Sequence, residues 1–246
     1  MTRLSVNVNK IALLRNQRHT GVPDVAAFAA ACLDAGAHGI TVHPRPDGRH
    51  IRPGDVAELG RLCQARNVEF NIEGNPLDAA WLPESGWRDW LSGVLEARPD
   101  QATLVPDATD QATSDHGFDC READTLEALS EVVKPLQDAG IRVSVFVDAE
   151  PEAASVAAQT GCERVELYTG PYAAEPSLLA AYDAAAEAAR SAGLGVNAGH
   201  DLDLTNLPPF LDRVRADEVS IGHAFTADCL LLGVAEATAR YLACCR

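Results

Sequence analysis

The ten residues from Asp34 to His43 read DAGAHGITVH, and they combine a helix end, a strand start and a polar residue after the strand. Glycine adopts the left-handed backbone that commonly closes a helix, so the Asp-Ala-Gly step indicates a helix end. The β-branched run that follows it is typical of a buried strand. The same order returns in DAGIRV from Asp138 and in SAGLGV from Ser191. This repetition predicts parallel strands joined by helices.

Eight short apolar runs are expected to be strands. They are Leu4–Val8, Gly39–Val42, Glu69–Ile72, Thr103–Val105, Arg142–Val147, Arg164–Tyr168, Gly195–Asn197 and Glu218–Ile221. Expected helices lie between them, at Pro23–Ala35, Pro53–Arg66, around Ala79–Glu96, Arg121–Ala139, Pro151–Gln159, Pro176–Ala192 and Ala224–Ala243. Eight such units in 246 residues predict one (β/α)8 TIM barrel domain over residues 1–246. The competing fold is an open doubly wound sheet, but no GxGxxG follows the first strand.

The overall charge narrows the class of partner. The formal net charge is −16, from 36 acidic and 20 basic residues, which disfavours nucleic acid and anionic membranes because both need clustered cations. Small anionic ligands remain compatible, since a phosphate needs only a few local donors. The seven scattered cysteines fit reduced thiols, and neither a signal peptide nor a membrane-length apolar stretch is recognised. We therefore expect a cytoplasmic protein.

Polar residues follow each predicted strand on its carboxyl side. They are Asn7 and Asn9, His43, Glu73, Asp107, Asp148, Glu166 and Thr169, His200, and the pair Gly222 and His223. In a barrel these strand ends meet at one mouth, which is where such enzymes carry their active sites. Loops are polar in general, however, so the pattern alone is weak evidence.

The first two segments combine amides, arginines and histidines. Alternation along the first strand places Asn7 and Asn9 on the same side, toward the barrel axis if Val6 and Val8 face the helices. The alternative is that these amides bond to backbone at the rim. His43 and Arg45 lie two residues apart, a spacing suited to proton transfer beside an anionic substrate, with His50 close behind. A purely structural histidine is the alternative for His43.

The remaining segments offer carboxyls and glycine turns. Glu73 and Glu166 each lie in an apolar strand, where reduced solvation raises a carboxyl pKa toward the range of a general base. A buried ion pair is the alternative for both. The Gly-His pairs at His200 and His223 follow the last two strands, where barrels frequently bind phosphate.

Several motifs resemble, in order and spacing, those of the pyridoxine 5′-phosphate synthase family. They are VNVNKIALLRNQR, GITVHPRPDGRHI, FNIEG, LVPD, VSVFVDA, VELYTGPYA, LGVNAGHDL and SIGHA. The resemblance extends from the first strand to the last helix. It implies condensation of 1-deoxy-D-xylulose 5-phosphate with 3-amino-2-oxopropyl phosphate to pyridoxine 5′-phosphate, with release of phosphate and water. It also implies no metal or organic cofactor and assembly into a homo-octamer.

The resemblance further implies a role for each matching residue. His43 and Glu73 would accept protons, His200 would donate one, and Glu166 would stabilise a charged intermediate. The amino-ketone phosphate would be held by Asn7, Arg18, Asp201, Gly222 and His223. The pentulose phosphate would be held by Asn9, Lys10, Arg45, His50 and Thr113.

The chain departs from the family pattern at three places. Asn9 and Lys10 replace the Asp-His of many members, Ser114 and His116 replace Thr and Gly beside Thr113, and His19 replaces a glycine after Arg18. Two other functions remain as alternatives. A metal-dependent hydrolase would use His43, Glu73, Glu166 and His200 as ligands, although no HxH or HExxH pair is present. A barrel that binds sugar phosphates without catalysis is the second.

Overall fold

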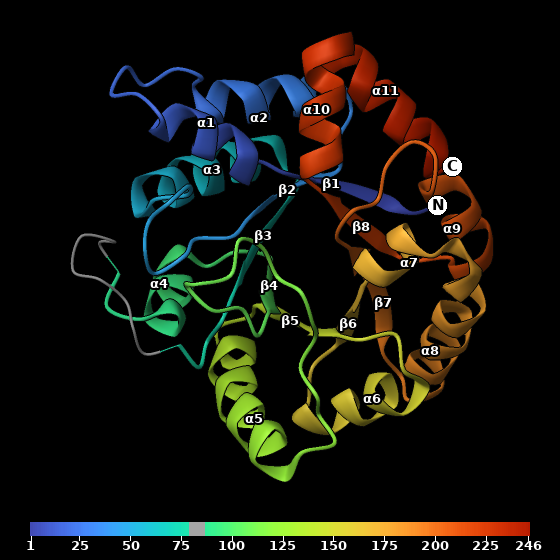
Figure 1. The fold of residues 1–246 in the computed structure, drawn as a ribbon. Helices are drawn as coiled ribbons and strands as arrows, with labels where there is room; N and C mark the ends of the chain where they lie inside the picture. The colour runs from blue at the N-terminus through green and yellow to red at the C-terminus, as the bar shows by residue number, and fades with distance from the viewer. Residues whose placement is uncertain (79–86) are drawn as a thin grey trace.

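Eight parallel strands close into a barrel in the computed structural model, which describes residues 1–78 and 87–246. Each strand pairs with its neighbours in the chain, and β8 returns to pair with β1 (Figure 1). The strands are β1 (Arg3–Asn7), β2 (Gly39–Val42), β3 (Glu69–Gly74), β4 (Gln101–Leu104), β5 (Arg142–Val147), β6 (Arg164–Tyr168), β7 (Gly195–Gly199) and β8 (Glu218–Ile221). The predicted TIM barrel is confirmed.

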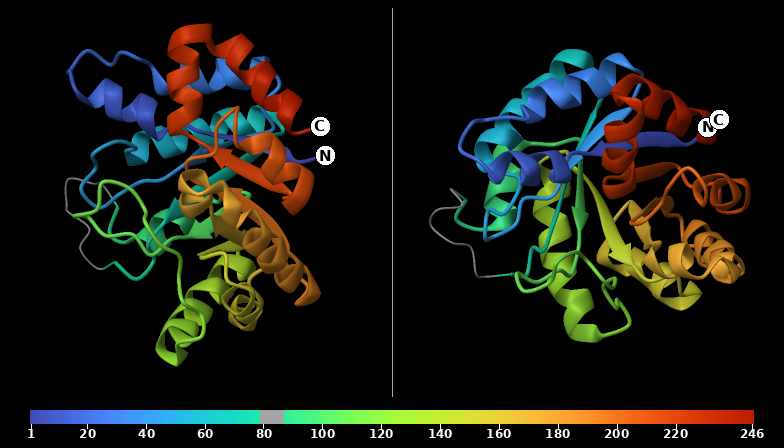
Figure 2. Two further views of the ribbon diagram at one scale, coloured as in Figure 1. Left: turned by 45° about the vertical axis from the view of Figure 1, so that its right-hand side comes forward. Right: turned by 45° about the horizontal axis from the view of Figure 1, so that its top comes forward.

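Helices surround this barrel on its outside (Figures 1 and 2). In the described residues they are α1 (Asn9–Asn16), α2 (Val25–Asp34), α3 (Pro53–Arg66), α4 (Trp90–Ala97), α5 (Ala123–Asp138), α6 (Pro151–Val156), α7 (Gly170–Ala174), α8 (Leu179–Ser191), α9 (Leu207–Val214), α10 (His223–Leu232) and α11 (Val234–Cys244), with 3₁₀ turns η2 (Ala157–Thr160) and η3 (Pro176–Leu178). None of them is long and apolar enough to span a membrane.

The strands alternate between a polar inner face and an apolar outer face. In β3, for example, Phe70 and Ile72 are buried in the hydrophobic core, whereas the side chain of Asn71 accepts a hydrogen bond from Thr103 of β4 at 3.1 Å. On the inner face of β1, the Ser5 hydroxyl lies 2.6 Å from that of Thr41 on β2. A period of two carries this difference along every strand. The polar inner face ends at the carboxyl ends of the strands, where the residues of the mouth lie.

The predicted secondary structure needs correction at several places. The first strand ends at Asn7, and α1 begins at Asn9, so these two residues do not share one face of a strand as expected. The single helix expected over Ala224–Ala243 is two helices, because Gly233 interrupts it with a φ of 82°. Helices α7 and α9 were not expected. The helix expected around Ala79–Glu96 is observed as α4 from Trp90, and its first part lies outside the described residues.

Candidate active site

The carboxyl ends of the strands surround a cavity of about 390 Å³. Its lining contains thirteen of the fourteen residues that the sequence nominated, all except Arg18: Asn7, Asn9, Lys10, His43, Arg45, His50, Glu73, Thr113, Glu166, His200, Asp201, Gly222 and His223. The sequence did not nominate Leu13, Arg49, Val105, Ala112, Ser114, Phe146 and Ser220, which also line it. The barrel therefore brings residues from its first to its last strand to one place.

Two asparagines connect the ends of the first three strands. Asn7 Nδ2 donates to Glu73 Oε2 at 3.3 Å, and Asn7 Oδ1 accepts from the backbone N–H of Asn9 at 3.0 Å. Asn9 Oδ1 then accepts from the backbone N–H of His43 at 2.9 Å. Both amides therefore have protein partners at the rim, and they fix the position of Glu73 and His43 relative to each other.

His43 lies between two carboxylates. Its Nδ1 is 3.5 Å from Glu73 Oε2, and its Nε2 is 3.1 Å from Asp107 Oδ2. Burial alone would lower the pKa of His43, but the charges of Asp107 and Glu73 outweigh burial and raise this pKa to about 9. The sequence placed Asp107 after a strand without assigning it to the site, and nothing in its local motif indicated a contact with His43.

Two arginines join the β2–α3 loop to the β4–α5 loop. Arg45 Nη2 lies 2.9 Å from Asp107 Oδ2, and Arg45 Nη1 donates to the carbonyls of Ala108 at 2.9 Å and Gln111 at 3.1 Å. Arg49 Nη1 donates to the same Gln111 carbonyl at 2.8 Å. The two guanidinium groups thus hold one loop against the other while they line the cavity.

Glu73 is fixed at its backbone as well as at its carboxylate. Trp90 is fully buried, and its Nε1 donates to the Glu73 carbonyl at 3.1 Å. Ser220 donates its hydroxyl to Glu73 Oε1 at 3.3 Å. A carboxylate held by several donors on rigid elements can accept a proton from a substrate without moving first.

Glu166 lies inside the barrel and is buried. Burial raises its pKa well above the ordinary range, and the nearby negative charges of Glu73 and Glu218 raise it further. Its neutral form, which can donate a hydrogen bond, is therefore favoured, and a second carboxyl with a different environment, that of Glu73, lies nearby. Two carboxyls that differ in this way are a common arrangement for acid–base chemistry.

Two further histidines of the wall, His200 and His50, have different partners. His200 Nε2 lies 2.8 Å from the Thr113 hydroxyl, and its Nδ1 lies 2.9 Å from Asp201 Oδ2. His200 and Asp201 both have positive φ angles, 89° and 57°, an uncommon backbone for these residues that is often found at functional sites. Burial lowers the pKa of His50 to about 2, and its Nδ1 accepts from the Ile51 N–H at 2.9 Å.

The far side of the cavity is suited to an anion. Gly222 precedes the first turn of α10, whose N-terminus presents backbone N–H groups beside Lys10 and His223. Asp201 lies near these two residues, and its pKa is lowered mainly by its contact with His200. Arg18 does not join this group, since it is exposed and borders a separate hollow with Arg15, His19 and Arg52.

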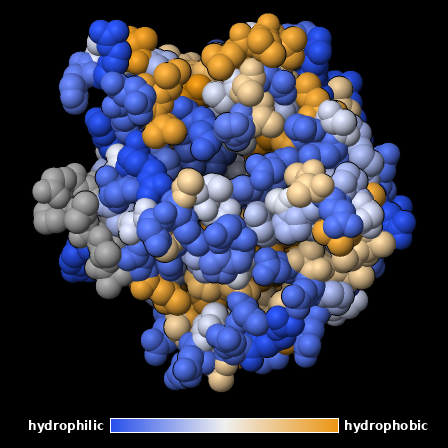
Figure 3. Space-filling model, viewed as in Figure 1, coloured by the Kyte–Doolittle hydropathy of each residue, from blue (hydrophilic) through white to orange (hydrophobic). Residues whose placement is uncertain are grey.

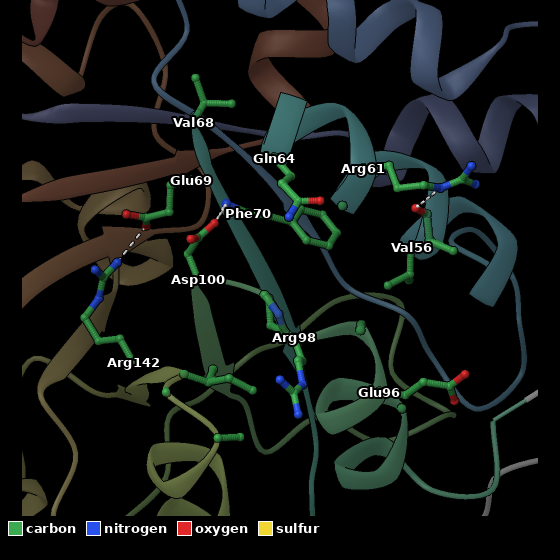
Figure 4. Close-up of a pocket in the computed structure, with 18 of the residues that line it drawn as sticks. Val56, Arg61, Gln64, Val68, Glu69, Phe70, Glu96, Arg98, Asp100 and Arg142 are labelled. Carbon is green, nitrogen blue, oxygen red and sulfur yellow. Dashed lines mark hydrogen bonds and ion pairs between the residues drawn. The ribbon is translucent and has the colours of Figure 1, made fainter. Parts of the chain in front are cut away.

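A larger hollow of about 1060 Å³ lies at the opposite end of the barrel, beside α3 and α4. Figure 4 shows its charged residues, and the ion pair of Glu69 with Arg142 at 2.8 Å occupies the strand side. Asp100 is likewise engaged, because it accepts from the backbone N–H of Phe70 at 2.8 Å. None of the residues nominated from the sequence lines this hollow. Within residues 1–78 and 87–246, no group of three or more histidine, cysteine or acidic side chains is arranged to hold a metal ion.

Comparison with known proteins gives a consistent family. A family model described as "Pyridoxal phosphate biosynthesis protein PdxJ" matches residues 4–246. A pyridoxine 5′-phosphate synthase from Xylella fastidiosa strain M23 is 52% identical, over 98% of this chain and 94% of its own. The enzyme of the same name from Xanthomonas oryzae pv. oryzae strain PXO99A is 51% identical, over 97% and 94%.

Solved structures with low sequence identity share the fold. Thiamine phosphate pyrophosphorylase from Pyrococcus furiosus aligns with a TM-score of 0.61 at 13% identity, covering 99% of this chain and 95% of its own. The Amycolatopsis orientalis BexX/CysO complex contains a chain that aligns with a TM-score of 0.63 at 15% identity, covering 100% and 90%. At such identities the likeness shows the barrel fold alone.

Proposed function

This chain belongs to the family of the pyridoxal phosphate biosynthesis protein PdxJ and is a pyridoxine 5′-phosphate synthase, and we propose that its reaction takes place in the cavity at the barrel mouth. There 1-deoxy-D-xylulose 5-phosphate condenses with 3-amino-2-oxopropyl phosphate, and inorganic phosphate and water are released. One observation supports the assignment of the site: thirteen of the predicted site residues, from all parts of the chain, line this one cavity.

The residue types fit the steps that this condensation needs. Imine formation, enolisation, loss of phosphate and ring closure each move protons, and each needs acids and bases close to the substrate. Glu73 is suited to accept a proton, because donors from Asn7 and Ser220 already hold its carboxylate in place. His43 exchanges protons beside it, and His200 donates from the opposite wall.

Glu166 completes the group of four catalytic side chains. In its neutral form, which burial favours, it would donate a hydrogen bond, and after loss of its proton it would stabilise a positive charge such as an iminium. Its neighbour Glu73 differs in having Ser220 and Asn7 as donors. The two carboxyls are therefore assigned different tasks.

The substrate phosphates are assigned to two groups of residues. Asn7, Asp201, Gly222 and His223 would hold the amino-ketone phosphate near the N-terminus of α10, with Arg18 reaching it only if its loop moves. Asn9, Lys10, Arg45, His50 and Thr113 would hold the pentulose phosphate. The arginine contacts to the Ala108 and Gln111 carbonyls must then loosen or be shared when this substrate binds.

Incubation of the purified protein with both phosphorylated substrates tests the activity. We expect pyridoxine 5′-phosphate and inorganic phosphate to appear in equal amounts, and neither to appear when one substrate is left out. A folded protein that binds both substrates but yields no product would favour the alternative of a barrel that binds sugar phosphates without catalysis.

Self-association is the second part of the proposal. Figure 3 shows hydrophobic side chains gathered over α10 and α1, two helices that contact each other. Leu14 of α1 is 51% exposed, and Leu230 and Leu231 of α10 are 76% and 85% exposed. Exposed leucines in this number are typical of a surface that another protein covers. We assign it to contacts between copies in a homo-octamer, and light scattering of the protein in solution would measure the mass.

The state of the cysteines and the kind of substrate support a cellular location. All seven cysteines are free thiols, and five of them are buried. Free thiols persist in a reducing compartment, and the substrates are phosphorylated intermediates of metabolism. We therefore place the enzyme in the cytoplasm.

A further inference from the structure

Asp107 contacts two cations of the β2–α3 loop and stands behind the cavity wall. Its side chain is 5% exposed, and it is not among the described residues that line the cavity. One of its oxygens, Oδ2, lies 3.1 Å from His43 Nε2 and 2.9 Å from Arg45 Nη2. A single buried carboxylate thus holds an imidazole and a guanidinium from the same loop.

Each ring nitrogen of His43 faces the carboxyl of another residue. Asp107 Oδ2 lies 3.1 Å from Nε2 and Glu73 Oε2 lies 3.5 Å from Nδ1, as ion-pair contacts without the alignment of a full hydrogen bond at Nε2. An ionised carboxylate can only accept a proton, so this environment favours a proton on both nitrogens. A neutral imidazole would direct a lone pair at one of these carboxylates. With His43 charged, two cations, His43 and Arg45, lie beside the carboxylate of Asp107 and the carboxyl of Glu73 in this buried cluster.

The electrostatics agree with this arrangement. Burial alone would raise the pKa of Asp107, but the charges of His43 and Arg45 outweigh burial and lower it. Asp107 is therefore ionised at neutral pH. Among the charges that raise the pKa of His43, that of Asp107 is the largest, ahead of Glu73. Burial is the main cause of the lowered pKa of His50, and the charges of His43, Arg45, Arg49 and Lys10 lower it further, so His50 stays neutral.

We propose that Asp107 is a positioning residue that orients the His43 ring and keeps it doubly protonated, so that His43 enters the catalytic cycle as a proton donor. This inference rests on the proposed function. Nε2 is buried and, apart from its ion-pair contact with Asp107, has no hydrogen-bond partner among the described residues, so the proton available to substrate is the one on Nδ1, beside Glu73. The acceptor role that the family resemblance implies for His43 then follows its donation.

His43 gives up its proton when an oxygen leaving group departs from the substrate. When a C–O bond of the substrate breaks, its electron pair stays on the leaving oxygen, and that oxygen takes the proton from His43 Nδ1. His43 is left as a neutral imidazole that can accept the next proton released by substrate. Asp107 remains ionised throughout and exchanges no proton, and its charge stabilises the imidazolium when it forms again.

The substitution Asp107→Asn tests this role, because asparagine keeps the shape of the side chain and removes its charge. We would follow the His43 ring by NMR across pH in protein with labelled histidine, using His43→Gln to assign the signal. In the wild type we expect His43 to titrate near pH 9. In Asp107→Asn we expect its pKa to fall toward 6.5, because loss of a contacting opposite charge typically moves a pKa by about one to three units.

Turnover supplies the second measurement. If His43 acts as a proton donor, kcat/KM falls at the pH at which His43 loses its proton. In Asp107→Asn the alkaline limb of the pH–rate profile should therefore shift to lower pH, together with the pKa of His43. At pH 8 we expect roughly a tenfold or greater loss, with most activity recovered at pH 6. Asp107→Glu restores the charge and should restore part of the alkaline limb. A loss of equal size at every pH, with an unmoved limb, would overturn the proposal and leave Asp107 a structural role only.

A matched control lies at the next strand end. Asp148 follows β5 and accepts from the backbone N–H of Gly117 at 3.0 Å, without contact to His43. Asp148→Asn should leave the His43 titration unchanged. If Asp107→Asn does not fold, the wild-type titration decides alone, since a His43 pKa at or below 6.5 would refute the proposal. The titration needs no turnover, so it remains informative even if the proposed synthase activity fails.

Discussion

Glu166 Oε1 occupies the position into which a side chain at residue 199 would project, since a Cβ on Gly199 would lie 2.2 Å from that oxygen. The two residues lie on the neighbouring strands β6 and β7. Glycine at this position therefore leaves the room in which Glu166 faces the barrel axis.

The substitution Gly199→Ala should displace Glu166 and lower kcat by roughly 10²-fold, because a misplacement of about 1 Å can have this effect on catalysis. Steady-state kinetics and circular dichroism would measure activity and folding together. Gly54→Ala is the matched control, because a Cβ there meets nothing within 4 Å. Wild-type turnover in Gly199→Ala would show that the position of Glu166 is unimportant.

Asn9 replaces an aspartate that many family members carry, and its hydrogen bond suggests why both residues are accepted. Its Oδ1 accepts from the His43 backbone N–H, which a carboxylate oxygen does equally well. We expect Asn9→Asp to keep the thermal midpoint close to that of the wild type. Asn9→Ala should lose about 1 kcal/mol of stability in denaturant titration. Equal stability losses in the two variants would contradict this explanation.

Trp90 supports Glu73 through the hydrogen bond from its Nε1 to the Glu73 carbonyl. Trp90→Phe removes the donor and leaves a buried carbonyl without it, for which we expect a loss of about 1–3 kcal/mol in the free energy of unfolding. Urea denaturation followed by circular dichroism would measure it. A loss within about 0.5 kcal/mol, the usual range for surface substitutions, would mean that water or another group replaces the indole.

The charge of His43 makes a prediction for stability against pH. Its pKa is 6.5 in an unfolded chain and is raised to about 9 in the fold, so the fold binds the proton more tightly. The stabilisation is therefore fully present below pH 6.5 and is lost as pH rises through about 9. The difference in thermal midpoint between wild type and His43→Gln should shrink over this interval. A difference that stays constant from pH 6 to pH 9.5 would indicate a neutral His43.

The fold could be predicted because its signals are local. Runs such as Gly39–Val42 and Glu218–Ile221 coincide with the observed strands, since the β propensity of their β-branched residues acts within a few residues. Helix α1 was missed because Asn7 and Asn9 continue the sequence alternation of the strand, although the strand itself ends at Asn7. Asn7 Oδ1 accepts from the Asn9 N–H, and the chain turns there into the helix. No helix was predicted over Leu207–Val214, although proline is suited to the first helical turn, where α9 carries it.

The sequence could predict which residues belong to the candidate site but not which of them contact each other. Polar residues after strands, with the family motifs, pointed to His43, Glu73, Glu166 and His200, and the barrel gathers them because parallel strands end at one rim. The contact of His43 with Asp107 joins two loops across β3, so no local pattern encodes it. For the same reason the separation of Arg18 from the cavity could not be foreseen.

The central claim is that side chains of the barrel mouth transfer the protons that form pyridoxine 5′-phosphate, and Glu73→Gln tests it most directly. Glutamine keeps the shape of Glu73 but cannot act as a base. With both substrates saturating, we expect the wild type to form the product. We expect Glu73→Gln to keep its fold and to have a kcat lower by roughly 10²-fold or more. Product formation by Glu73→Gln at the wild-type rate would contradict the claim.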